Sequence, residues 1–114
     1  MSKRESQHVI IWEFQVRAGM ESQFEAVYGP SGDWAQFFRL DEAYQGTELV
    51  RDLRSERKYL TLDYWSSEQS YNEFRKQHQS EYGAIDQKCE AMIEAEREIG
   101  IYAPCGADTH VPDR

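Results

Sequence analysis

Large apolar side chains alternate with polar ones along several short stretches of this chain, which is the pattern of half-buried β-strands. In the first stretch, residues 8–17, every second position carries a large apolar side chain. The residues that share this face of the predicted strand are Ile10, Trp12, Phe14 and Val16. Similar β-rich stretches predict three further strands. They cover about residues 45–53, 58–65 and 96–102.

Apolar residues spaced three and four apart predict helices between these strands. A first helix is expected over about 20–28 and a short one over 34–39, on either side of a break that contains Gly and Pro. A long helix is expected over about 67–95, with Gly83 marking a kink or break within it. The apolar face of this long helix comprises Tyr71, Phe74, His78, Tyr82, Ile85, Cys89 and Met92.

The resulting order of elements, β-α-β-β-α-β, favours an α+β fold. Its split βαβ arrangement gives one antiparallel sheet with helices on a single face. We expect one domain over residues 1–114, with its core in about 8–102 and a C-terminal tail over 103–114.

The predicted strand 58–65 carries large apolar groups on both faces. One face holds Tyr59, Thr61, Asp63 and Trp65, and the other holds Leu60, Leu62 and Tyr64. A sheet that is apolar on both faces must be covered on both. Because one short chain has too few helices for two covers, we expect a homodimer in which two sheets pack face to face.

Composition and charge narrow the choice of partners. The formal net charge of −8 disfavours nucleic acid and anionic membranes, which need clustered Lys and Arg. A hydrophobic content of 39% and a mean hydropathy of −0.83 are low for a self-sufficient core, which again favours a dimer. The sequence shows no signal peptide and no apolar run as long as a membrane span. We therefore expect a cytoplasmic protein with reduced thiols.

Cysteine and histidine spacing argues against a metal or redox centre. Cys89 and Cys105 do not form a CxxC pair. His8, His78 and His110 are scattered, with no pair at helical spacing, so no metal site is predicted.

Three segments of the chain carry a resemblance to a known family. They are Trp12-Glu-Phe-Gln-Val-Arg-Ala-Gly19, Tyr44-Gln-Gly-Thr-Glu-Leu-Val-Arg-Asp52, and Asp63-Tyr-Trp-Ser-Ser-Glu68 with the following Tyr71 and Phe74. They resemble the antibiotic biosynthesis monooxygenase (ABM) domain, a family of the dimeric α/β barrel superfamily. The resemblance covers about residues 8–102. It implies a ferredoxin-like fold, a dimer built by two facing sheets, and a pocket between sheet and helices, with Trp65 matching a strand-end tryptophan beside that pocket.

The family includes cofactor-free oxygenases of phenolic polyketides and haem-degrading enzymes, and this chain departs from both patterns. Haem degraders resemble one another in an asparagine on the first strand, where this chain has Trp12, and in a histidine near the position of Ala84. The polyketide oxygenases place an asparagine near the position of Thr61. The only asparagine of this chain is Asn72, so neither active-site pattern transfers intact.

Aromatic residues from several predicted elements could converge on one cavity, which would suit a flat apolar ligand. They are Trp12, Phe14, Trp34, Phe37, Phe38, Trp65 and Tyr82. The alternative is that these side chains form an ordinary core.

Two residues are candidates for catalytic roles. His78 could accept a phenolic proton, because the pKa of imidazole lies near neutrality, or it could be a structural histidine. Arg51 could hold a phenolate or carboxylate through paired donors. Asp63, which we group with the ligand-binding residues, should face the same side as Arg51 from a neighbouring strand. The alternative for these two is a cross-strand ion pair.

These observations support two functions of different classes. The first is a cofactor-independent monooxygenase acting on a phenolic or other aromatic small molecule, with no cofactor expected. The second is a non-catalytic, small-molecule-binding dimeric protein, which the missing asparagine favours. Haem binding or degradation is a third and weaker reading. Fold alone does not choose among them, because function depends on the site.

Overall fold

The computed structural model describes residues 7–105 and contains four strands and their connecting helices. The strands are β1 (His8–Val16), β2 (Tyr44–Arg51), β3 (Lys58–Trp65) and β4 (Ile93–Tyr102); the helices are α1 (Glu21–Tyr28), α2 (Asp33–Phe38), α3 (Glu68–Gln77), α4 (Gln79–Cys89) and the short 3₁₀ helix η2 (Glu90–Met92). The predicted strands are confirmed to within a few residues at each end. Part of the predicted tail, residues 106–114, lies outside the described residues, as does His110.

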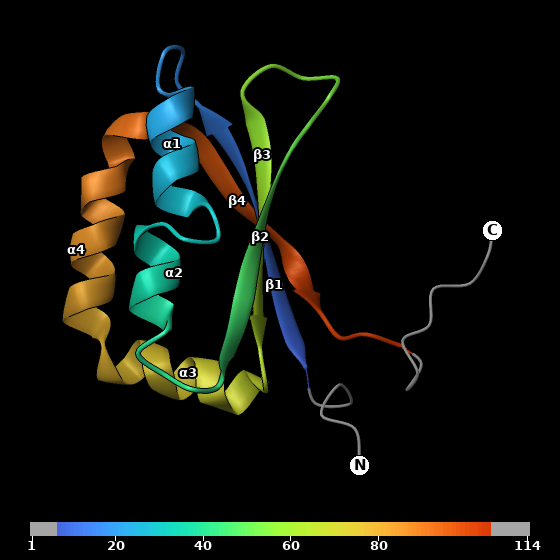
Figure 1. Ribbon diagram of the computed structural model, residues 1–114, viewed down its shortest axis with the longest axis vertical. Coiled ribbons are helices and arrows are strands. Elements are labelled where there is room, and N and C mark those ends of the chain that lie inside the picture. Colours follow the sequence, from blue (N-terminus) through green and yellow to red (C-terminus); the bar gives the residue numbers. More distant parts are fainter. Residues whose placement is uncertain (1–6, 106–114) are drawn as a thin grey trace.

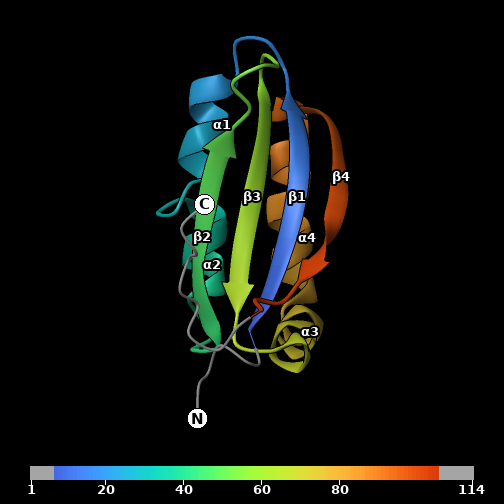
Figure 2. The same cartoon turned by 90° about the vertical axis from the view of Figure 1, so that its right-hand side faces the viewer.

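The four strands form one antiparallel sheet in the order β2-β3-β1-β4. Figure 1 shows the sheet edge-on, with the helices packed on one face. Figure 2 shows the opposite face, which no helix of the described chain covers. The predicted α+β, ferredoxin-like architecture is confirmed.

Alternation along β3 places different side chains on the two faces of the sheet. On the face toward the helices, Tyr59, Thr61 and Trp65 are buried. Leu60 and Leu62 point to the opposite face and are only half-buried. The uncovered face therefore keeps an apolar centre that this chain does not itself shield.

The long helix predicted over 67–95 is wrong in two respects. The chain forms two helices, α3 and α4, and they separate at His78, whose φ of −120° and ψ of 37° are not helical. Gly83 lies inside α4 and causes no break. The helical stretch also ends earlier than predicted, because β4 already begins at Ile93. The start of α3 is fixed by Ser67, whose hydroxyl accepts a hydrogen bond from the backbone N–H of Ser70 at 3.1 Å.

A β-bulge interrupts the pairing of β2 with β3. The register shifts between Tyr44 and Gly46, which leaves Gln45 as one extra residue. Gly46 adopts a φ of +137°, a conformation that strongly favours glycine. Because of the extra residue, Tyr44 and Thr47 lie on the same face of the sheet although they are three positions apart in the sequence.

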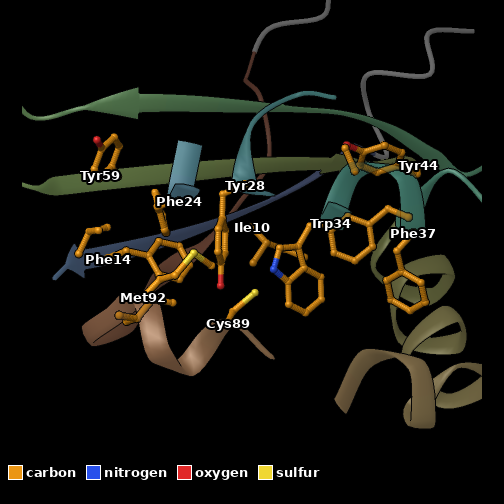
Figure 3. Packing of buried hydrophobic residues seen from close by; sticks show 14 of the residues in the cluster. Ile10, Phe14, Phe24, Tyr28, Trp34, Phe37, Tyr44, Tyr59, Cys89 and Met92 are labelled. Carbon is orange, nitrogen blue, oxygen red and sulfur yellow. The ribbon is translucent and has the colours of Figure 1, made fainter. Parts of the chain in front are cut away.

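Aromatic rings fill most of the layer between sheet and helices, as Figure 3 shows. Phe24 of α1 stacks on Tyr28 with ring centroids 4.3 Å apart, and Phe14 of β1 meets Tyr28 at 4.9 Å. Phe24 and Val16 have no exposed surface. This continuous packing holds the helices against the sheet. No helix among residues 7–105 is both long and apolar enough to span a membrane.

Candidate active site

A cavity of about 310 Å³ lies between the sheet and the helices. Every major element except β2 and the turn η2 contributes to its wall. The lining residues are Ile10, Trp12, Phe14, Tyr28, Trp34, Phe38, Thr61, Asp63, Tyr71, Arg75, Tyr82, Asp86 and Glu96. An apolar cavity of roughly 150 Å³ holds benzene, so this one has room for an aromatic ligand of about two rings.

The cavity contains a carboxyl group held by neighbouring hydroxyls. Thr47 Oγ1 donates a hydrogen bond of 2.6 Å to Asp63 Oδ1 from the adjacent strand. Tyr44 Oη is hydrogen-bonded to the same Thr47 oxygen. Since the single proton of Thr47 goes to the carboxylate, the Tyr44 hydroxyl is the donor in that second bond. The bulge in β2 makes this chain of three groups possible, because it turns Tyr44 and Thr47 to one face.

Compared with an exposed aspartate, the environment of Asp63 stabilises the protonated form of its carboxyl group. Burial raises the pKa of its carboxyl group from 3.8 to about 6, and the hydrogen bond from Thr47 lowers the pKa by less than burial raises it. No ion pair within the described part of the chain involves Asp63. The group is therefore a carboxylate at neutral pH that takes up a proton in mildly acidic solution.

Arg75 supplies the cation of the cavity wall. Its guanidinium carbon lies 3.9 Å from the ring centre of Tyr82, a cation–π contact between α3 and α4. Arg75 Nη1 also donates a hydrogen bond of 3.1 Å to the hydroxyl oxygen of Tyr71. These contacts hold the side chain along the wall, with further N–H donors available to a ligand.

The charges of the lining are predominantly negative. Asp63, Asp86 and Glu96 contribute carboxyl groups, whereas Arg75 is the cation of the lining. Burial and the nearby Asp86 raise the pKa of Glu96. A ligand with no net negative charge fits this balance better than an anion does.

The polar hydrogens of the cavity have few partners within the protein. Trp34 Nε1 is buried without a hydrogen-bond acceptor among the described residues. Figure 3 shows that indole nitrogen beside Tyr28 and Cys89. Burial raises the pKa values of Tyr28 and Tyr82, so both hydroxyls keep their protons at neutral pH. The cavity therefore offers neutral donors to a ligand as well as the carboxylate of Asp63.

The structure brings together six of the eight residues predicted to bind a ligand. Those that line the cavity are Trp12, Phe14, Trp34, Phe38, Asp63 and Tyr82. Trp65 instead lies in the core behind the cavity, fully buried, with ring centroids 5.5 Å from Phe38 and 5.3 Å from Phe74. Phe37 is not in the cavity lining and packs in the core, with its ring centroid 4.9 Å from that of Phe74. Ligand binding by the six remains a prediction.

The two predicted catalytic residues lie outside the cavity lining. His78 occupies the junction of α3 and α4, where its ring centroid is 4.5 Å from that of Phe74 and its Nδ1 is 3.5 Å from a carboxylate oxygen of Glu81. Arg51 is exposed at the far end of β2, opposite Tyr59. It faces the same side of the sheet as Asp63, as predicted, but the strand partner of Asp63 is Thr47.

Sequence reasoning missed several polar residues of the cavity. Tyr71 and Arg75 on α3, and Tyr82 and Asp86 on α4, are each four residues apart and so share a helix face. That spacing was visible, but only the aromatic members were singled out. Thr47, which bonds to Asp63 from outside the lining, was missed because its pairing depends on the register of β2 against β3, and the bulge that brings Tyr44 to the same face has no signal in the sequence except Gly46. Among residues 7–105 no cluster of His, Cys, Asp or Glu could hold a metal ion.

An antiparallel four-stranded sheet with helices on one face is the α+β fold of solved structures described as antibiotic biosynthesis monooxygenases. One similar structure is SnoaB, a cofactor-independent oxygenase from Streptomyces nogalater. It has a TM-score of 0.71 and 16% identity over 89% of this chain and 95% of that one.

Two other structures show the same likeness. A candidate antibiotic biosynthesis monooxygenase from Bordetella bronchiseptica has a TM-score of 0.65 and 21% identity, over 88% of this chain and 98% of that chain. Another from Nitrosomonas europaea has a TM-score of 0.66 and 10% identity, over 88% and 91%. At these identities the likeness establishes the fold. No protein-family model matches the sequence, and no curated protein sequence matches it.

Proposed function

We propose that this protein is a cofactor-independent monooxygenase that acts on a phenolic aromatic compound. The observation that carries the proposal is the cavity itself, in which aromatic walls surround the Asp63 carboxylate, a group in no ion pair with any described residue. Such a cavity binds a flat ring and supplies a base for its hydroxyl group. The likeness to SnoaB, described as a cofactor-independent oxygenase, supports the same reaction class.

In this reaction the protein removes a proton from the substrate hydroxyl and the electron-rich anion reacts with dioxygen. For a substrate with a ring methylene group, that carbon loses two hydrogens and becomes a carbonyl. One oxygen atom enters the product and the other leaves as water, so the substrate itself supplies the electrons. The aromatic walls limit the access of water to reactive intermediates.

Oxygen uptake tests the proposal directly. Purified protein with phenols and hydroquinones of one to two rings should consume dioxygen without added flavin, metal or haem. The variant Trp12→Ala removes one wall and should lower kcat/KM at least about tenfold, because the ring loses its contact surface. Leu40→Ala, at a residue 66% exposed outside the cavity, is the matched control and should behave as the wild type. The absence of uptake with every compound would contradict the proposal.

The second candidate is a small-molecule-binding protein without turnover. The observation in its favour is Thr61, which stands on the cavity wall near the position where the polyketide oxygenases carry an asparagine. Quenching of tryptophan fluorescence by the same phenols, without oxygen uptake, would favour it. Haem degradation has little support from the site, because no histidine is among the lining residues.

We also propose a homodimer built through the uncovered face of the sheet. Half-buried Leu60, Leu62 and Tyr64 give this face an apolar centre. Charged groups lie around them: Arg97 Nη2 lies 3.0 Å and Lys58 Nζ 3.6 Å from the carboxylate of Glu13. An apolar centre with a polar rim is typical of protein interfaces.

A further inference from the structure

We propose that Asp63 is the residue that accepts the substrate's proton, and that Thr47 positions it. The proposal rests on the oxygenase function above and names its base. The Asp63 carboxyl group lies in the cavity lining, on the central part of the sheet, and faces the aromatic walls contributed by α1 and α2.

Hydrogen bonding leaves part of this carboxylate free. Asp63 Oδ1 accepts a hydrogen bond from Thr47, whereas no group within the described residues bonds to Oδ2. A carboxylate has about four acceptor positions, so a ligand hydroxyl could be accepted without displacing Thr47. The bond from Thr47 also restricts rotation of the side chain, which holds the free oxygen in one place.

The other ionisable groups around the cavity suit this role less well. Those that line the same cavity as Asp63, or are bonded to it through Thr47, are Tyr28, Tyr44, Tyr71, Arg75, Tyr82, Asp86 and Glu96. Burial raises the pKa values of Tyr28, Tyr44 and Tyr82, so these phenols remain protonated and cannot act as bases. Asp86 and Glu96 are exposed residues, whereas Asp63 is half-buried in the cavity wall. His78 is outside the lining.

The proton transfer balances simply. The O–H bond of the substrate breaks, the proton moves to Asp63 Oδ2, and the electron pair stays on the substrate oxygen. A simple phenol has a pKa of about 10, so a carboxyl group whose pKa is raised by burial accepts the phenol's proton more readily. The difference in pKa between phenol and carboxyl falls from about six to about four when the carboxyl pKa rises to about 6. The remaining difference favours substrates whose hydroxyl is more acidic than that of simple phenol.

The first experiment compares the wild type with Asp63→Asn in oxygen uptake, using any phenol that the wild type turns over. Asparagine keeps the shape and the bond from Thr47 but accepts no proton. We expect kcat to fall by about 10²–10⁴-fold, while ligand affinity from tryptophan fluorescence falls by about tenfold at most. Asp52→Asn, an exposed carboxylate outside the cavity, is the control and should keep full activity. Unchanged kcat in Asp63→Asn would overturn the proposal and leave the oxygenase function standing.

The pH profile separates the role of Thr47 from a merely structural one. Activity of the wild type should rise with pH through about 6, because only the carboxylate accepts a proton. Thr47→Val removes a hydrogen bond that lowers the pKa of Asp63, so this limb should move to higher pH, and Thr47→Ser should restore it. A uniform loss of rate at every pH, with the limb unmoved, would remove Thr47 from the proposal.

A binding measurement keeps the test independent of turnover. 4-Nitrophenol reports its own ionisation by absorbance, and tryptophan fluorescence reports its binding. Between pH 5 and 6.5 its affinity for the wild type should rise about tenfold as Asp63 becomes a carboxylate, because charged hydrogen bonds are the stronger ones. Asp63→Asn should show no such rise. If this pH dependence appears but no phenol is oxidised, the oxygenase function fails while the assignment of Asp63 stands; the same rise in Asp63→Asn would overturn the assignment.

Discussion

At the scale of single residues, ionisation of Asp63 lowers the stability of the folded state. The pKa of Asp63 is about 6 in the folded chain against 3.8 unfolded, so the folded state binds the proton more tightly. The stabilisation from this group is complete below about pH 4 and is lost as pH rises through 6. A half-buried carboxyl group with no cation partner among residues 7–105 is typical of functional sites, where ionisable groups are held at a cost in stability.

Asp63→Asn should therefore stabilise the protein at neutral pH. At pH 7.5 we expect its free energy of unfolding to exceed that of the wild type by about 1–2 kcal/mol, a value reduced because the cavity admits water. The excess should shrink toward pH 4.5, where the wild-type carboxyl is protonated. Urea denaturation at the two pH values measures it. The same difference at both pH values would show that Asp63 does not titrate as described.

At the scale of elements, Gly83 and Gly46 differ in whether their backbone conformation suits a residue other than glycine. Gly83 lies in the exposed interior of α4, and a Cβ atom there would meet nothing within 4 Å. Gly46 has a φ of +137°, which L side chains rarely adopt. Gly83→Ala should raise the free energy of unfolding by about 0.5–1 kcal/mol, and Gly46→Ala should lower it by at least about 1 kcal/mol. Thermal melts of the two variants beside the wild type decide this; a destabilised Gly83→Ala would contradict the regular helix.

The type of each element could be predicted from the sequence, because buried side chains recur at every second residue in a strand and at every third or fourth residue in a helix. The break at His78 could not be predicted, because the chain turns there from α3 to α4 without a Gly or Pro to mark the turn. Similar reasons apply to the site. Large aromatic side chains such as Trp34 identified the cavity walls in advance, whereas Thr47 became part of the site only through strand register.

At the scale of the whole molecule, the uncovered sheet face is the surface through which we expect two copies of the chain to associate. If two copies pack through it, sedimentation at micromolar concentration should give about twice the monomer mass of 13.4 kDa. Leu62→Lys places a charge in that face and should raise the dimer dissociation constant on the order of 100-fold. Leu40→Lys adds the same charge at an exposed position away from the sheet and should leave the mass unchanged. A monomeric wild type would exclude this assembly.

The extra residue Gln45 in β2 has a consequence for how such a site could change over evolution. If β2 kept Gln45 but paired with β3 regularly, without the bulge, Tyr44 would turn to the face opposite Thr47 and its hydroxyl would no longer reach Thr47. The acid in the cavity would lose its hydroxyl relay although every residue of that relay remained in the chain. Two homologues with the same catalytic side chains could then differ in acid–base behaviour through the presence or absence of one bulge, which a comparison of residue identities alone would overlook.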